Sequence, residues 1–377
     1  MKNILMVFTD PHLPYSPTII NLFNELKKHS KVQIITYQPE QLFSLQKLDD
    51  PDILYLSNAD LHYRPEGLLK RTVKKAIEKI IKPSPAEIVR RNLHTNKTEA
   101  VIKKIRDFEG EIIAVDFLAL YCVQQAGKAA HLVSLEIHLN DRYRDNCLFD
   151  KIKSVIIQSN ERYAYLFKDL QIPTFIVQNS PRYSNIEPDK SARRKNKLIY
   201  CGSAVPGFGI FSCLDFLLDY PEYQLTVKGA VPPSTKEAIE QFYKQLIVEE
   251  RLILDDSYMS EESLNLFVSR FRIGFVFYDL YRFDHVRTFN YYTAPSGKMF
   301  QYFNSGVPVI GNRLPGLEII EHSKSGVLIS YLSSAKMKQA IDQIESSYDE
   351  YADNSKKTSK DFDFTTNIQD FITFIKN

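Results

Sequence analysis

The sequence alternates short apolar runs with longer amphipathic stretches, and this pattern limits the possible folds more than any other feature. Buried parallel strands read as short continuous apolar runs, and the helices that connect them carry an apolar period of about 3.6 residues. The alternation therefore predicts α/β architecture with parallel sheets. The predicted strands of a first series are residues 4–8, 32–36, 52–56, 111–116, 130–138, 154–158 and 174–178, and those of a second series are residues 197–203, 223–229, 251–256, 273–279, 307–312 and 326–330.

A polar stretch that contains two prolines separates the two series, and a chain of 377 residues is long enough for two ordinary domains. We predict an N-terminal domain over residues 1–182, a linker over 183–196 and a C-terminal domain over 197–355. Residues 356–377 are predicted to form a closing helix that packs back toward the N-terminal domain. The loops at the carboxyl ends of parallel strands form the binding crevice of such sheets, so the groove between the domains is the expected site.

The composition argues against several classes of protein. The net charge is only +2, so no overall attraction to nucleic acid is expected. The four cysteines form no C-x-x-C pair and have no histidine at zinc-ligand spacing, so no metal site is predicted. No run of about 18 apolar residues could span a membrane, and the apolar start is too short for a secretory signal. A cytoplasmic protein is expected. The spacing of Gly202, Gly207 and Gly209 differs from G-x-G-x-x-G, which disfavours an NAD enzyme.

The most informative stretch is residues 291–330, YYTAPSGKMFQYFNSGVPVIGNRLPGLEIIEHSKSGVLIS. A Pro-Ser-Gly turn leads into a predicted helix, which is followed by a buried strand, the loop RLPG and a second helix. The first turn of a helix presents free N–H groups and a partial positive charge. The two helix starts, at residues 296–298 and 314–317, are therefore predicted seats for a diphosphate.

This stretch resembles the donor-binding signature of GT-B glycosyltransferases, in particular the large retaining family four. The family has a proline, a small residue, a lysine, two further residues, a glutamate and a tyrosine, and then Gly-x-Pro-Val-Ile. Here the pattern stands at residues 295–302, with one extra glycine and with Gln301 in place of the glutamate, and at residues 306–310. The resemblance implies two Rossmann-like domains that face each other across a cleft, with the donor bound in the C-terminal domain.

The resemblance also implies roles on the donor side. Position 301 would bind the donor ribose, and a glutamine can still accept a hydrogen bond there, although without charge assistance. A second glutamate of the family falls on Thr293, and no basic residue follows Gly202 closely. The leaving diphosphate would then rely on Lys298, Lys228, Arg282 or Arg287. The alternative for these cations is an ordinary solvated side chain. The predicted donor-binding residues are Gly202, Ser203, Lys228, Arg287, Ser296, Gly297, Gln301, Leu314, Gly316 and Glu318.

Lys298 and His138 are the predicted catalytic residues. His138 closes an apolar run, and the resemblance implies that it contacts the transferred sugar and the phosphate region; the alternative is a partly buried histidine at a strand end. For Glu136 a structural pairing with a neighbouring lysine is expected. Asp10 and His12 lie in the loop after the first strand and are predicted to meet the acceptor.

Residues 66–106 are rich in lysine and arginine, and GLLKRTVKKAIEKIIK within them has the pattern of a basic amphipathic helix. Such a helix can lie on an anionic membrane surface, which would suit a lipid-linked acceptor. It can equally be an ordinary surface helix that packs on a sheet. The interleaved aromatic residues typical of single-strand nucleic-acid binding are missing from this pattern.

The resemblance implies the transfer of a hexose-type sugar from a UDP- or GDP-linked donor, with retention of configuration and without a metal. The acceptor would be a glycan or a lipid-linked saccharide, in the synthesis of a bacterial surface polysaccharide. Two alternatives stay open at this point. One is a sugar-nucleotide epimerase or a phosphorylase on the same scaffold. The other is a non-catalytic partner that binds nucleotide or glycan, which Gln301, Thr293 and the missing basic residues motivate.

Overall fold

The computed structural model of the chain describes residues 2–38, 47–56, 98–137, 143–168, 170–185, 195–282 and 285–377. His138 and residues 66–97 of the predicted basic helix lie outside these ranges, and for Arg287 only the backbone is described. Residues 98–106 are helical. No helix in the described ranges is both long and apolar enough to cross a bilayer.

The N-terminal domain is built on a parallel sheet. Its described strands are β1 (Asn3–Phe8), β2 (Lys31–Tyr37), β3 (Ile53–Leu56), β4 (Glu111–Val115), β5 (Ala130–Ser134), β6 (Ile152–Ile157) and β7 (Thr174–Ile176), in the spatial order β3-β2-β1-β4-β5-β6-β7. The strand order reverses between β1 and β4, which places the switch point of this sheet at the end of β1. The helices described here are α1 (Pro17–Lys27), α4 (Asp116–Gln125) and α5 (Asn160–Phe167).

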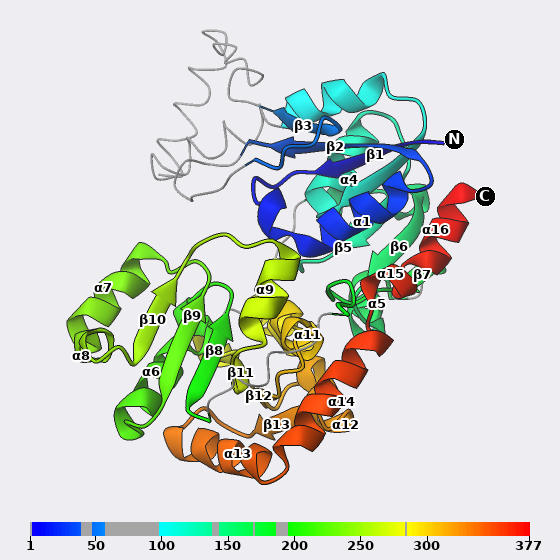
Figure 1. The fold of residues 1–377 in the computed structure, drawn as a ribbon. Helices are drawn as coiled ribbons and strands as arrows, with labels where there is room; N and C mark the ends of the chain where they lie inside the picture. The colour runs from blue at the N-terminus through cyan, green and yellow to red at the C-terminus, as the bar shows by residue number, and fades with distance from the viewer. Residues whose placement is uncertain are drawn as a thin grey trace, which may run out of the picture.

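The C-terminal domain repeats this architecture. Its parallel sheet comprises β8 (Lys197–Cys201), β9 (Gln224–Lys228), β10 (Leu252–Asp255), β11 (Ile273–Val276), β12 (Val309–Asn312) and β13 (Gly326–Ile329), in the order β10-β9-β8-β11-β12-β13. The helices that follow these strands are α6 (Ile210–Asp219), α7 (Pro233–Phe242), α8 (Lys244–Val248), α9 (Glu261–Val268), α10 (His285–Thr293), α11 (Gly297–Asn304), α12 (Ile319–His322) and α13 (Ser334–Ser346). Figure 1 shows the two sheets in separate lobes of the molecule.

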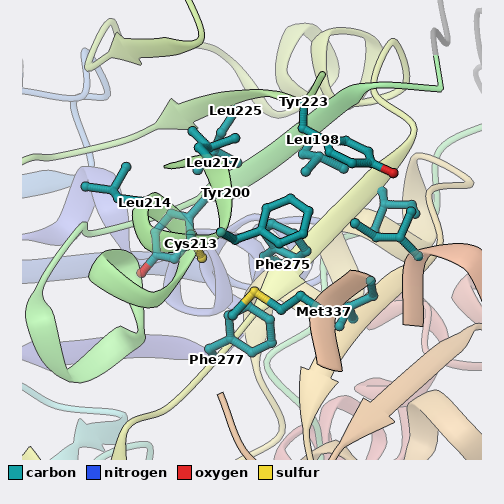
Figure 2. Close-up of a cluster of buried hydrophobic side chains, with 14 of the residues drawn as sticks. Leu198, Tyr200, Cys213, Leu214, Leu217, Tyr223, Leu225, Phe275, Phe277 and Met337 are labelled. Atoms are coloured by element: carbon teal, nitrogen blue, oxygen red, sulfur yellow. The ribbon is translucent and has the colours of Figure 1, made fainter. Parts of the chain in front are cut away.

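The core of the C-terminal domain lies between its sheet and helices α6 and α13. Leu198, Tyr200 and Phe275 of the strands pack there with Leu217 of α6 and Met337 of α13 (Figure 2). All five side chains are completely buried. The first strand after the linker and the helix near the C-terminus therefore stabilise the same core.

The end of the chain returns to the N-terminal domain through α14 (Tyr348–Asp361), α15 (Phe364–Asn367) and α16 (Gln369–Lys376). In Figure 1 α16 lies beside the N-terminal sheet, and its buried side chains belong to the core that α1 and the N-terminal strands form. Phe371 there lies edge-on to Phe175 of β7, with a ring distance of 5.5 Å. The chain crosses between the domains twice, and the two crossings are bonded together: Tyr183 N–H donates to Asp363 at 2.8 Å, and Phe364 N–H donates to the Pro181 carbonyl at 3.2 Å.

The predicted fold class is confirmed, because both sheets are parallel and the strands fall where the apolar runs stand. Several strands are shorter than predicted, and β5 differs most from its predicted run. The run 130–138 was expected to be a strand throughout, but β5 ends at Ser134. The next two amides, those of Leu135 and Glu136, donate to the carboxylate of Asp116 instead of to a neighbouring strand.

Candidate functional site

A glycine follows each of the strands β8 and β9, and these two residues, Gly202 and Gly229, lie against each other. Gly202 follows β8 with φ +97°, and its N–H donates to the Lys228 carbonyl at 2.8 Å. The side chain of Lys298, from the first turn of α11, passes directly over Gly202. A Cβ atom on Gly202 would lie 2.8 Å from the Lys298 Cε atom. The bare backbone at Gly202 therefore makes room for the lysine.

Lys298 is held in an aromatic environment. Its Nζ donates to the Tyr200 hydroxyl at 3.2 Å and lies 4.4 Å and 4.7 Å from the ring centres of Tyr200 and Phe208. Burial lowers the pKa of Lys298 to about 8. Among the described residues, no carboxylate lies within ion-pair distance of this amine. A partly desolvated cation without a counter-anion favours the arrival of an anion.

The first turn of α11 adds free hydrogen-bond donors beside this cation. The amides of Gly297 and Lys298 donate to no group in the described part of the chain. The preceding residue, Ser296, is 3% exposed, and its hydroxyl makes no capping bond to the helix. The first turn of α11 therefore supplies two N–H groups without described partners, the positive end of the helix and the ammonium group of Lys298, and such an arrangement favours phosphate groups.

Gln301 lies one turn further along α11, on the same face as Lys298. Its amide nitrogen donates to the Asn265 carbonyl oxygen of α9 at 2.5 Å. Asn265 is 4% exposed, so this contact fixes the orientation of the glutamine side chain. The side-chain carbonyl oxygen of Gln301 accepts no hydrogen bond from the described residues and remains available to an incoming hydroxyl donor.

Two other predicted cations, Lys228 and Arg282, are already paired. The Lys228 ammonium donates to the Asp255 carboxylate at 2.9 Å and to the Ser257 hydroxyl and carbonyl at 2.7 Å and 2.6 Å. These three contacts use all three donors of an ammonium group, so a diphosphate at Lys228 would have to displace one of them. Arg282 is half exposed and pairs with Asp279 at 2.8 Å.

Ser203 is a predicted donor-binding residue that follows Gly202 in the chain. Its backbone carbonyl accepts a hydrogen bond from the Tyr200 hydroxyl at 3.1 Å.

The loop after β12 lies near Phe300 of α11 and not near Lys298. Leu314 is 5% exposed and packs into the core, so only its backbone can meet a ligand. Gly316 lies against the Ala294 carbonyl, which a Cβ atom would overlap. Gly316 and the exposed Glu318 line a cavity of about 260 Å³ together with Gln158 of the N-terminal domain, and Lys298 does not line this cavity.

The predicted acceptor residues lie at the end of β1. The imidazole Nδ1 and the backbone N–H of His12 both contact one carboxylate oxygen of Asp10 at 2.7 Å, and both side chains are about half exposed. Tyr15 follows in the short helix Leu13–Tyr15. Burial, together with Asp256 and Tyr258 of the C-terminal domain, raises the pKa of Tyr15. The loops after β1 and β10 therefore face each other from opposite domains.

Sequence reasoning missed Asp116, which stands at the carboxyl end of β4 with φ 59°. Burial and the charge of Glu136 raise the pKa of Asp116 to about 7. A carboxylate directly after a buried strand was the signal that could have revealed it.

The expected pairing of Glu136 with a neighbouring lysine was wrong. The Glu136 carboxylate accepts from the side-chain amide of Asn290 at 2.6 Å, because α10 brings Asn290 across the seam between the domains.

Metal ligands do not cluster in the described residues, where no group of three His, Cys, Asp or Glu side chains could hold an ion. All four cysteines lie in the described ranges, where each is buried and forms no disulfide.

No family model and no curated protein matches this chain. Several solved structures do. HepE of Anabaena, in complex with UDP and glucose, is 14% identical with a TM-score of 0.69, and the match covers 100% of both chains. AviGT4, a glycosyltransferase involved in avilamycin A biosynthesis, is 12% identical with a TM-score of 0.57, over 100% of this chain and 97% of the other. The pneumococcal O-GlcNAc transferase GtfA, in complex with UDP and GlcNAc, is 14% identical with a TM-score of 0.54, over 74% and 60%. At these identities the comparisons show the fold alone: two parallel-sheet Rossmann-like domains arranged as in GT-B glycosyltransferases.

Proposed function

We propose that this chain is a nucleotide-sugar-dependent glycosyltransferase whose donor binds at the start of α11. The observation that carries the proposal is the ammonium group of Lys298, which stands without a carboxylate partner among the described residues and beside two free amides. A nucleoside diphosphate has the charge and the oxygen acceptors that this arrangement lacks. Structures of HepE and GtfA hold UDP on a similar fold, which favours a UDP-linked donor over a GDP-linked one.

In the proposed reaction the acceptor hydroxyl oxygen forms a bond to the anomeric carbon, the bond between that carbon and the diphosphate oxygen breaks, and the hydroxyl proton leaves with the nucleotide, on which negative charge develops. Lys298 and the amides of Gly297 and Lys298 would stabilise that charge, and the Gln301 carbonyl would accept a ribose hydroxyl. Asp10 and His12, across the groove, would meet the acceptor, a glycan or a lipid-linked saccharide. His138 is proposed to contact the transferred sugar, and the resemblance favours retention of configuration, metal-independent transfer and a role in surface polysaccharide synthesis. Peripheral contact with an anionic membrane through residues 66–106 belongs to the same proposal.

Calorimetric titration with UDP tests the donor site through its dependence on pH. The pKa of Lys298 is about 8 in the free protein, so the amine is charged below pH 8 and loses its charge as the pH rises. A bound diphosphate favours the charged amine. UDP affinity is therefore expected to change little between about pH 7 and 7.5, to be about twofold weaker at pH 8 and then to fall by up to roughly tenfold per pH unit. Uridine, which lacks the diphosphate, serves as the control and should show no such fall. A UDP affinity that does not change up to about pH 9.5 would contradict the role of Lys298.

Turnover decides between a transferase and a non-catalytic partner, which the glutamine at position 301 keeps open. UDP-sugars and GDP-sugars are incubated with oligosaccharide and lipid-linked acceptors, and the released nucleoside diphosphate is measured. A transferase releases the diphosphate only when an acceptor is present. A protein that binds UDP but releases no nucleoside diphosphate from UDP-sugars is a non-catalytic binding partner. A protein that converts the sugar of the donor into its isomer in the absence of an acceptor is an epimerase.

Replacing Gln301 by glutamate is expected to tighten the binding of UDP about fivefold, because a charged acceptor roughly doubles the strength of a hydrogen bond. Asn265 can donate to the introduced carboxylate if its amide group turns over, which gives up the long contacts of its oxygen with Asn304 Nδ2 and Ser305 Oγ at 3.4 Å and 3.5 Å. The measurement is the UDP dissociation constant of Q301E and of the wild-type protein. A dideoxy-ribose analogue of UDP is the control, and Q301E should bind it no better than the wild type does. Equal gains for both ligands would show that Gln301 does not face the ribose.

A further inference from the structure

Residues Leu135–Ile137 leave the carboxyl end of β5 without continuing the strand, and side chains hold them in place. The amides of Leu135 and Glu136 donate to Asp116 of the same domain at 2.7 Å and 3.1 Å. The amide of Ile137 donates to the Asn290 side-chain carbonyl at 3.2 Å. Three successive amides are thus held by side chains from both domains. In the sequence, the next residue is His138.

Asn290 is the residue that makes the contact from the C-terminal domain. It is 4% exposed, and both ends of its side chain are used: the amide nitrogen donates to the Glu136 carboxylate at 2.6 Å, while the oxygen accepts from Ile137. Its backbone carbonyl accepts from Arg162 Nη1 at 3.2 Å. A single residue of α10 therefore makes three hydrogen bonds to the N-terminal domain.

Arg162 supports the contact from the N-terminal side. It is completely buried on α5, and its Nη2 donates to the Leu135 carbonyl at 2.6 Å. Next to it, Tyr165 stacks on Phe289 of α10 with a ring distance of 4.2 Å. The carboxylates of Asp116 and Glu136 are the charged groups that balance the guanidinium. Glu136 is exposed and Arg162 Nε has no partner among the described residues, but the other polar groups of Arg162 and Asn290 are paired, and the bonds of Asn290 across the seam favour one relative position of the two domains.

We propose that Asn290 is a positioning residue for sugar transfer: its hydrogen bonds join α10 of the donor domain to Leu135–Ile137 and so fix the donor domain relative to the carboxyl end of β5. We call Asn290, Arg162, Glu136 and the amide of Ile137 the clasp. This inference rests on the function proposed above. The clasp does not include the start of α11, so it acts on the geometry of transfer and not on the binding of the nucleotide.

The test exchanges the two ends of the Asn290–Glu136 hydrogen bond. Asn290→Asp places a carboxylate against the Glu136 carboxylate and breaks the clasp. Glu136→Gln keeps the bond, because a glutamine oxygen still accepts from Asn290. The double variant N290D/E136Q restores the bond with reversed polarity, since the introduced glutamine can donate to the introduced aspartate. Asn290→Ala removes the contacts without adding a charge and serves if N290D does not fold.

Four quantities are measured for each variant: the kcat for transfer, the donor KM, the UDP dissociation constant and hydrogen exchange of a peptide that contains Ile137. N290D is expected to lower kcat by about 10- to 100-fold, as small misplacements of reacting groups do, with the donor KM and UDP affinity within about twofold of the wild type. Its Ile137 peptide should exchange faster. E136Q should lose less than about threefold in kcat, and the double variant should recover most of the loss of N290D.

Specific results would overturn the inference. Unchanged exchange at Ile137 in N290D and N290A would show that the clasp does not hold this segment. Faster exchange with unaltered kcat would show a structural contact that does not position the reaction. A wild-type protein that neither binds UDP nor transfers sugar would instead refute the proposed function, and the exchange data alone would then decide whether the clasp exists.

Discussion

Replacing Lys298 by methionine is expected to weaken UDP binding by roughly 30-fold or more, because a charge-assisted hydrogen bond to a phosphate contributes about 2 kcal/mol. The free protein should melt at the same temperature as the wild type or higher. The reason is that the folded chain keeps this ammonium partly desolvated without a described carboxylate partner, and methionine fills a similar volume beside Tyr200 and Phe208 without that cost. Calorimetric titration with UDP and a thermal melt without ligand measure the two effects.

Lys357→Met is the matched control for K298M, since Lys357 is an exposed lysine on α14. It should leave UDP affinity unchanged. The opposite pattern, a K298M protein that melts much lower but binds UDP normally, would mean that Lys298 is a structural side chain and that the diphosphate binds elsewhere.

Replacing Gly229 by alanine is expected to destabilise the C-terminal domain by about 3 kcal/mol or more and to lower its melting temperature by roughly 6–12 °C. Gly229 follows β9 with φ +142°, a conformation that other residues rarely adopt. A Cβ atom there would also overlap the carbonyl oxygen of Gly202, and backbone cannot turn aside as a flexible side chain can. The clash pushes on the residue over which Lys298 passes, so UDP affinity should fall together with stability.

Gly127→Ala separates the two causes of that loss. Gly127 also has a positive φ, +80°, but an added Cβ atom there would meet no other atom within 4 Å. It should therefore cost only the conformational strain, about 1 kcal/mol. A circular dichroism melt of both variants measures the difference. Equal losses for G127A and G229A would show that the strand ends at Gly202 and Gly229 are not packed as tightly as described.

Local sequence patterns were sufficient for the fold and for the start of α11. A buried parallel strand needs only a short apolar run, and Pro295, Lys298 and Gln301 belong to one continuous motif whose helix the structure contains. Contacts between distant residues were not readable in this way. The bond between Glu136 and Asn290 joins residues 154 positions apart, and the Asp255 and Ser257 partners of Lys228 stand at the end of the next strand and just beyond it. The predicted roles of His138 and Arg287 stay predictions, because His138 and the Arg287 side chain are outside what the structure describes.

The paired crossings at Pro181–Tyr183 and Asp363–Phe364 limit how the two lobes can move. A single connecting chain would leave one lobe free to twist, tilt or swing about a point. Two adjacent chain segments that are joined by hydrogen bonds restrict this motion. They leave mainly a rotation of one domain about the line through the two segments. The groove can then open at its mouth by a rotation that breaks the hydrogen bonds of Asn290 to the N-terminal domain, and the paired segments bring the two walls back into the same alignment when these bonds form again.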